Sequence, residues 1–151
     1  MLRLIMAFSL FIALNANAID DERVINRMVS TTSFTADEIR ADYRTGCGSI
    51  SNRQMIICAK FQYTAADIEL NDNYNKIIKN LKTQNAISKL IKAQKALIVY
   101  RDATCEYETD EVEGSFLGVL NNSCLLAVTK SRIVQLRQYM KCQTPSCIEE
   151  R

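Results

Sequence analysis

The chain contains no histidine and no tryptophan, and only one proline and four glycines occur among its 151 residues. Without histidine it has no Ser-His or Cys-His nucleophile pair and no HExxH metal motif. The glycines form no phosphate-binding loop, and no CxxC pair is present. We therefore expect no metal and no cofactor, and we predict that the protein is not an enzyme. The net charge of +2 also gives no sign of a nucleic-acid partner.

Long apolar runs are also absent. The strongest one, residues 4–14, is too short to cross a bilayer. It follows Arg3 and precedes Ala16-Asn17-Ala18, a small-x-small cleavage pattern. These features predict a secretory signal peptide at residues 1–18, cleaved after Ala18, with a buried N-terminal helix as the alternative. Because residue 19 is not cysteine, no lipid or other membrane anchor is expected. The predicted location is the bacterial periplasm or the cell exterior, although a eukaryotic secretory route also fits.

All the cysteines lie after the predicted cleavage site. They are Cys47, Cys58, Cys105, Cys124, Cys142 and Cys147. An even number in an exported chain predicts three disulfides, and Cys142 is expected to pair with Cys147 around Pro145. Zinc binding by the thiols is the less favoured alternative, because histidine and CxxC pairs are absent.

Apolar residues recur at steps of three and four through much of the chain, which predicts helices. Long helices are expected at residues 52–81, 86–107 and 124–140. A short helix to about residue 43 follows the capping-box pattern Thr35-Ala36-Asp37-Glu38, and the remainder of the polar N-terminal segment is expected to be loose. Residues 106–123 have no clear period and are expected to form a loop with little regular structure.

The short break between the first two long helices predicts an antiparallel helical hairpin. The predicted fold is all-α, a three-helix bundle built on this hairpin and tied by disulfides at one end. We divide the chain into a signal peptide (1–18), a polar N-terminal segment with a short helix (19–46) and a helical domain (47–151).

Four cysteines are expected to meet at the open end of the hairpin, since Cys58 and Cys105 lie at similar distances from its turn. Three pairings are possible among Cys47, Cys58, Cys105 and Cys124. Proximity in the sequence alone favours Cys47–Cys58 and Cys105–Cys124.

The helix expected at residues 86–107 carries a guanidinium, that of Arg101, on its apolar stripe. Such a group needs partners if it is buried. Counted from the turn of the hairpin, Arg101 is level with Asp67, which predicts an interhelical ion pair. Glu69 and Asp102 are the rival partners, and a side chain that reaches solvent is a further alternative.

An amide, Gln94, lies on the same stripe seven residues before Arg101. It is level with Tyr74 on the preceding helix. The Tyr74 hydroxyl is therefore its expected hydrogen-bond partner.

Several short motifs follow one another at a fixed spacing between residues 47 and 136. They are Cys47 with Asn52-Arg53-Gln54-Met55 and Cys58-Ala59; Ala66-Asp67-Ile68-Glu69-Leu70-Asn71 with Tyr74; Leu90, Ala93-Gln94, Tyr100-Arg101-Asp102-Ala103 and Cys105; and Gly114-Ser115, Cys124, Thr129 and Arg132. Together they resemble the LprI-like family of bacterial lysozyme inhibitors. Leu97 stands where the family has tryptophan, and Glu113-Gly114-Ser115 stands for Gly-Gly-Ser. The resemblance implies an exported helical domain that inhibits lysozyme.

Residues 106–113 are rich in carboxylates and contain no lysine or arginine. The acidic residues are Glu106, Glu108, Asp110, Glu111 and Glu113. Without the predicted signal peptide the chain would carry a net charge of +1. The part of it outside residues 106–113 would then carry about +6. An acidic loop attracts cationic partners, and animal lysozyme is a small basic enzyme. We predict that this loop binds the partner and that Ser115 and Phe116 enter its cleft.

The predicted function is an exported binding protein that blocks the cleft of a lysozyme-type muramidase without chemistry. A cell-envelope structural or adaptor protein, gripping its partner through an apolar groove, is the alternative. The acidic residues also leave open a solubilising loop without a partner, or a hydrolase with paired carboxylates. The sequence leaves the oligomeric state open.

Overall fold

The computed structural model describes residues 20–44, 47–48 and 51–141. All regular structure in these residues is helical, which confirms the predicted all-α class. The helices are α1 (Asp21–Thr31), α2 (Ala36–Arg44), α3 (Asn52–Asn80), α4 (Gln84–Thr109) and α5 (Phe116–Lys141). The predicted signal peptide and the predicted Cys142–Cys147 pair lie outside the described residues.

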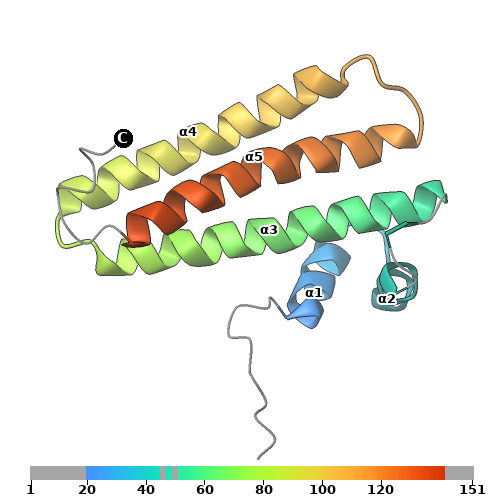
Figure 1. Cartoon of the computed structure of the whole chain (residues 1–151), viewed down its shortest axis with the longest axis horizontal. Helices are drawn as coiled ribbons and strands as arrows, with labels where there is room; N and C mark the ends of the chain where they lie inside the picture. The colour runs from blue at the N-terminus through green and yellow to red at the C-terminus, as the bar shows by residue number, and fades with distance from the viewer. Residues whose placement is uncertain (1–19, 45–46, 49–50, 142–151) are drawn as a thin grey trace, which may run out of the picture.

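The three long helices lie side by side, and the short helices α1 and α2 pack on α3 (Figure 1). Helices α3 and α4 run in opposite directions, as expected, and are joined by residues 81–83. However, α5 lies between them and packs against both, so it joins α3 to α4. Helices α3 and α4 still contact each other through Asp67 and Arg101, but each packs more extensively on α5 than on the other.

Hydrogen-bonded caps define where several helices begin. Thr35 and Glu38 form the predicted capping box of α2: the Glu38 N–H donates to Thr35 Oγ1 (3.3 Å), and the Thr35 N–H donates to Glu38 Oε2 (2.8 Å). The side chains of Asp20 and Thr83 accept backbone N–H groups at the starts of α1 and α4. Because the Thr35 backbone, the Arg53 guanidinium and the Thr35 hydroxyl all donate to the Glu38 carboxylate, the pKa of Glu38 is lowered to about 2.

Helix α3 is buried on two sides and contributes to two hydrophobic cores. Ile57, Phe61 and Ile68 belong to the core that α3 shares with α1 and α2. Ala66 and Leu70 belong to the core that it shares with α4 and α5. Two apolar stripes on one helix weaken any single period, so periodicity alone does not separate the two cores.

Helix α1 falls in the segment that was expected to be loose, and that expectation is wrong for residues 21–31. Val24, Ile25 and Met28 are at most 4% exposed. A short helix with so few apolar residues has little stability alone, and here burial against α3 stabilises it. The domain boundary between residues 46 and 47 stays a prediction.

Helix α5 begins at Phe116, well before the predicted start at residue 124, so most of the predicted loop at residues 106–123 is helical. A Cβ on Gly118 would lie 3.5 Å from the Ile56 side chain, so the start of α5 passes close over α3. The Asn122 side chain donates to the Gly118 carbonyl at 2.6 Å, and that of Ser123 donates to Val119. This close packing on α3 outweighs the weak helical pattern of the segment.

Candidate functional site

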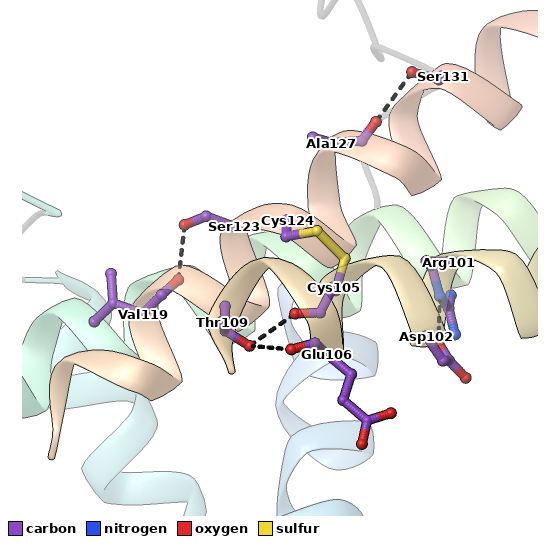
Figure 2. Close-up of a disulfide and its surroundings, with 10 residues drawn as sticks. All are labelled: Arg101, Asp102, Cys105, Glu106, Thr109, Val119, Ser123, Cys124, Ala127 and Ser131. Carbon is purple, nitrogen blue, oxygen red and sulfur yellow. Dashed lines mark hydrogen bonds and ion pairs between the residues drawn. A yellow bond between two sulfur atoms is a disulfide. The ribbon is translucent and has the colours of Figure 1, made fainter. Parts of the chain in front are cut away.

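The predicted acidic residues lie together at one end of the molecule, in a region that we call the acidic tip (residues 106–117). It consists of the end of α4, the connecting residues 110–115 and the first two residues of α5. All five carboxylates are exposed, as are Ser115 and Phe116. In Figure 2 the Glu106 carboxylate points away from the neighbouring disulfide.

The acidic tip is more regular than the loop that the sequence predicted. Glu106 and Glu108 lie on α4, and Phe116 is the first residue of α5, so only the part from Asp110 to Ser115 connects the helices. Thr109 closes the last turn of α4 by donating to the Cys105 carbonyl at 2.7 Å (Figure 2). These contacts fix the helical carboxylates relative to the core.

Two disulfides lie toward this end of the molecule, and the pairing favoured by the sequence is confirmed. Cys47 pairs with Cys58, and Cys105 pairs with Cys124, each with a Cα–Cα distance of 5.6 Å. The second bond joins the end of α4 to α5 at the base of the acidic tip (Figure 2).

Two further features position the connecting residues. Asn52 Nδ2, at the start of α3, donates to Ser115 Oγ at 2.9 Å. Gly114 has φ of 78°, a left-handed conformation that residues with a side chain rarely adopt. The Ser115 side chain is therefore held against α3, whereas the prediction has it free to enter a partner's cleft.

The charge of the acidic tip has no counter-charge within the described part of the chain. None of its carboxylates enters an ion pair there, although most other described acidic residues do. The last turn of α4 contains no basic residue. Acidic groups at a helix C-terminus oppose the helix dipole and cost stability. The carboxylates at the end of α4 therefore do not stabilise that helix.

Apolar side chains accompany these charges on the surface. Tyr107, between Glu106 and Glu108, is 83% exposed, and Phe116 is 45% exposed. Leu117 and Leu120 on α5 are also exposed. The sequence analysis missed Tyr107; an aromatic side chain between two carboxylates was the available signal. The combination of exposed aromatic rings and unpaired carboxylates is suited to binding a basic protein surface.

Away from the acidic tip, the predicted partners Asp67 and Arg101 lie in contact. Arg101 Nη1 is 3.3 Å from Asp67 Oδ1, and Arg101 Nε donates to the rival partner, Asp102, at 2.8 Å. Asp67 also faces Arg27 of α1 at 3.9 Å, so one carboxylate links α1, α3 and α4. Burial lowers the pKa of Arg101, but the hydrogen bond with Asp102 and the coulombic effects of Tyr63, Asp102 and Asp67 outweigh it, so that the pKa is raised.

Gln94 has a different partner from the one expected. Its Oε1 accepts a hydrogen bond from Arg132 Nε of α5 at 3.2 Å, and Tyr74 instead packs against the hydrophobic core. Arg132 Nη1 in turn donates to Gln135. The contact was not predicted because only α3 was considered as a neighbour of Gln94, whereas α5 also packs on α4.

The described residues offer no group of three or more side chains that could hold a metal ion. Within the same residues, none of the helices combines the length and apolarity needed to cross a membrane.

Comparison with known proteins places the disulfides and the acidic tip inside a matched region. The family model described as "Lysozyme inhibitor LprI" matches residues 47–136. An uncharacterized protein of Rhizobium meliloti (strain 1021) is 32% identical over 106 residues, which cover 62% of this chain and 76% of that protein. No solved structure matches the chain.

Proposed function

The chain belongs to the LprI family of lysozyme inhibitors, and from this premise we propose that it is an exported protein that binds a basic, lysozyme-type muramidase through the acidic tip and blocks its cleft. Binding is by surface complementarity, and the protein performs no chemistry on its partner. The observation that carries the proposal is the group of five exposed carboxylates without an ion pair in the described residues.

The position of these carboxylates supports an electrostatic role. Unpaired exposed charges steer association with a partner of opposite charge and make its rate depend on salt. Two of them, Glu106 and Glu108, lie on a helix tied by the Cys105–Cys124 disulfide. A surface held in this way loses little conformational freedom on binding.

The exposed aromatic rings beside the carboxylates provide the apolar part of the proposed contact. Tyr107 and Phe116 flank the connecting residues, and both present much of their surface to solvent. Aromatic side chains contribute much of the binding energy where they enter a partner's pocket. In the proposed complex, Tyr107 and Phe116 contact the rim or wall of the muramidase cleft.

Lysis of peptidoglycan by hen-type and goose-type lysozymes, with and without the protein, tests this function. We expect inhibition of at least one enzyme, and weaker inhibition as salt increases. A variant neutralised at the five positions should bind at least about tenfold more weakly. The matched comparison neutralises two carboxylates in each variant, Glu108 and Asp110 in the acidic tip or Asp21 and Asp37, which are exposed on α1 and α2. Equal loss in both variants, or no binding to either enzyme, would contradict the proposal for these targets.

The proposed location follows from the predicted leader and from the disulfides, which persist in oxidising compartments. Expression of the full chain should give a periplasmic or secreted product that begins at Ile19. Mass measurement of the intact protein from each fraction tests this. A product that keeps residues 1–18 and stays in the cytoplasm would contradict the proposed export.

An envelope adaptor remains the second candidate, because a groove of about 440 Å³ between α3 and α5 is lined partly by apolar residues, including Phe61, Ala65 and Val134. Capture of a membrane complex, without lysozyme, from envelope extract would favour it. Loss of that complex on Val134→Glu, but not in the variant with a neutralised acidic tip, would assign the binding to the groove.

A further inference from the structure

Helix α4 has an outer face that no other described element covers. In Figure 1 this helix forms one edge of the molecule, and α5 lies against one of its sides. The buried residues of α4 are Gln94, Arg101, Cys105 and Thr109. The outer face follows steps of three and four: Lys89, Lys92, Ala96, Val99, Ala103 and Glu106 on α4, and Asp110 at its C-cap, all of them exposed.

Apolar residues occupy the centre of this outer face. Val99 is 70% exposed, which is unusual for an aliphatic residue in the middle of a long helix. Ala96 and Ala103 lie one turn to either side of it. Small side chains in these positions allow a second helix to approach closely, to an interaxial distance of about 8 Å.

Charges of opposite sign occupy the two halves of the face. Lys89 and Lys92 lie before the apolar centre, and Glu106 and Asp110 lie after it. None of these four enters an ion pair within the part of the chain that the structure describes. The order is the reverse of the one that the helix dipole favours, so the arrangement does not stabilise α4 itself.

We propose that α4 pairs in antiparallel orientation with α4 of a second copy of this chain, about a two-fold axis at Val99. Residues equally distant from Val99 then face each other. Lys92 and Glu106 are each seven residues away and form a pair across the axis, as do Lys89 and Asp110, at ten and eleven residues. Ala96 packs near Ala103 of the other copy.

Charge complementarity selects this occupant and this orientation. In a parallel pair, lysines would face lysines and carboxylates would face carboxylates, which is unfavourable. In the antiparallel pair every charged position of the outer face meets the opposite sign, because the sequence is complementary to its own reverse. A two-fold interface uses one surface patch on both subunits, as this one does.

Sedimentation of the purified protein over a range of concentrations, at low and high salt, tests the proposal. We expect a reversible dimer that weakens as salt increases. Lys92→Glu should raise the dissociation constant about tenfold, because it replaces two attractions by two repulsions. Lys82→Glu, which changes an exposed lysine outside the outer face, is the matched control and should leave the dimer unchanged.

The double variant Lys92→Glu, Glu106→Lys should restore the dimer, because each copy then carries the exchanged charges. Circular dichroism checks that every variant is folded. A wild-type protein that stays monomeric at the highest concentration would overturn the proposal. A dimer that is insensitive to Lys92→Glu, or a double variant that fails to recover, would overturn it as well. The test does not involve lysozyme, so its result is read separately from the proposed inhibition, although Glu106 and Asp110 belong to both surfaces.

Discussion

The buried and the outer faces of α4 use polar residues in opposite ways. On the buried face, Arg101 contacts Asp67 and Asp102, and Gln94 accepts a hydrogen bond from Arg132. On the outer face and in the acidic tip, lysines and carboxylates are exposed and form no ion pair among the described residues. Charges with partners hold this molecule together, whereas charges without partners are available to another molecule.

Several residues of the motifs that carry the family resemblance fall on the first kind of position. Asp67, Arg101, Asp102 and Cys105 all make contacts between or within the long helices. The family match therefore reports a common scaffold. In the proposed function the exposed residues around this scaffold select the partner. The following predictions separate the roles of the buried and the exposed residues, beginning with the largest expected effect.

Loss of the Cys105–Cys124 disulfide should have the largest effect on stability. The bond closes a loop of 19 residues, so its removal should lower the free energy of unfolding by about 3 kcal/mol. We expect the double variant Cys105→Ala, Cys124→Ala to show this in denaturant unfolding. A loss of less than about 1 kcal/mol would mean that α4 and α5 hold together without the bond.

The next largest effect should follow from Asp67→Ala. This change leaves the 7% exposed Arg101 with Asp102 as its carboxylate partner and removes the contact with α1. Since Asp67 is itself partly exposed, we expect a loss of about 2 kcal/mol, below the range for fully buried pairs. The matched control on the same helix is Asp72→Ala, which breaks an exposed pair with Arg23 and should cost less than about 1 kcal/mol. Equal losses would show that the partly buried ion pair contributes no more to stability than the exposed one.

In the acidic tip, removing a charge is expected to raise the stability of the protein instead of lowering it. Glu108→Gln and Asp110→Asn remove negative charges from the C-terminal end of α4, so each should stabilise the protein slightly, by about 0.3–1 kcal/mol. Thermal unfolding at low salt measures the gain, and high salt should reduce it. Destabilisation by either change would show that these carboxylates have a structural partner.

The smallest expected effect concerns an exposed charge that does have partners, Glu38. Its pKa in the folded protein is lowered from 4.5 to about 2 by the Thr35 N–H and by Arg53. The ionised carboxylate therefore contributes stability above about pH 4.5, and this contribution is lost as the pH falls toward 2. Glu38→Gln should accordingly lose less stability than the wild type across this interval. Identical acid titrations of the two proteins would contradict the assignment.

Local sequence signals were sufficient for much of the scaffold. The helix predicted at residues 86–107 is α4, which extends two residues further at each end. The capping box at Thr35 forms as expected. The disulfide pairing followed from proximity in the chain. These features depend on residues that are close in sequence, so their interactions are encoded locally.

Contacts between distant segments were harder to predict. The sequence analysis missed α1 and the early start of α5, and it assigned Gln94 to Tyr74 although its partner is Arg132. Each of these errors involves packing against a helix whose position cannot be derived from local periodicity. For the same reason, two residues of the predicted acidic loop, Glu106 and Glu108, proved to be helical.

The all-α class, the family and the concentration of negative charge at residues 106–113 follow from the amino-acid sequence alone. Periodicity, motif spacing and composition are properties of the chain that do not depend on how its segments pack. The packing of distant segments places α5 against both α3 and α4, and it leaves the outer face of α4 uncovered by the other described helices. Which side chains are buried, and which partners they contact, depends on which surfaces of distant segments meet when the whole chain packs.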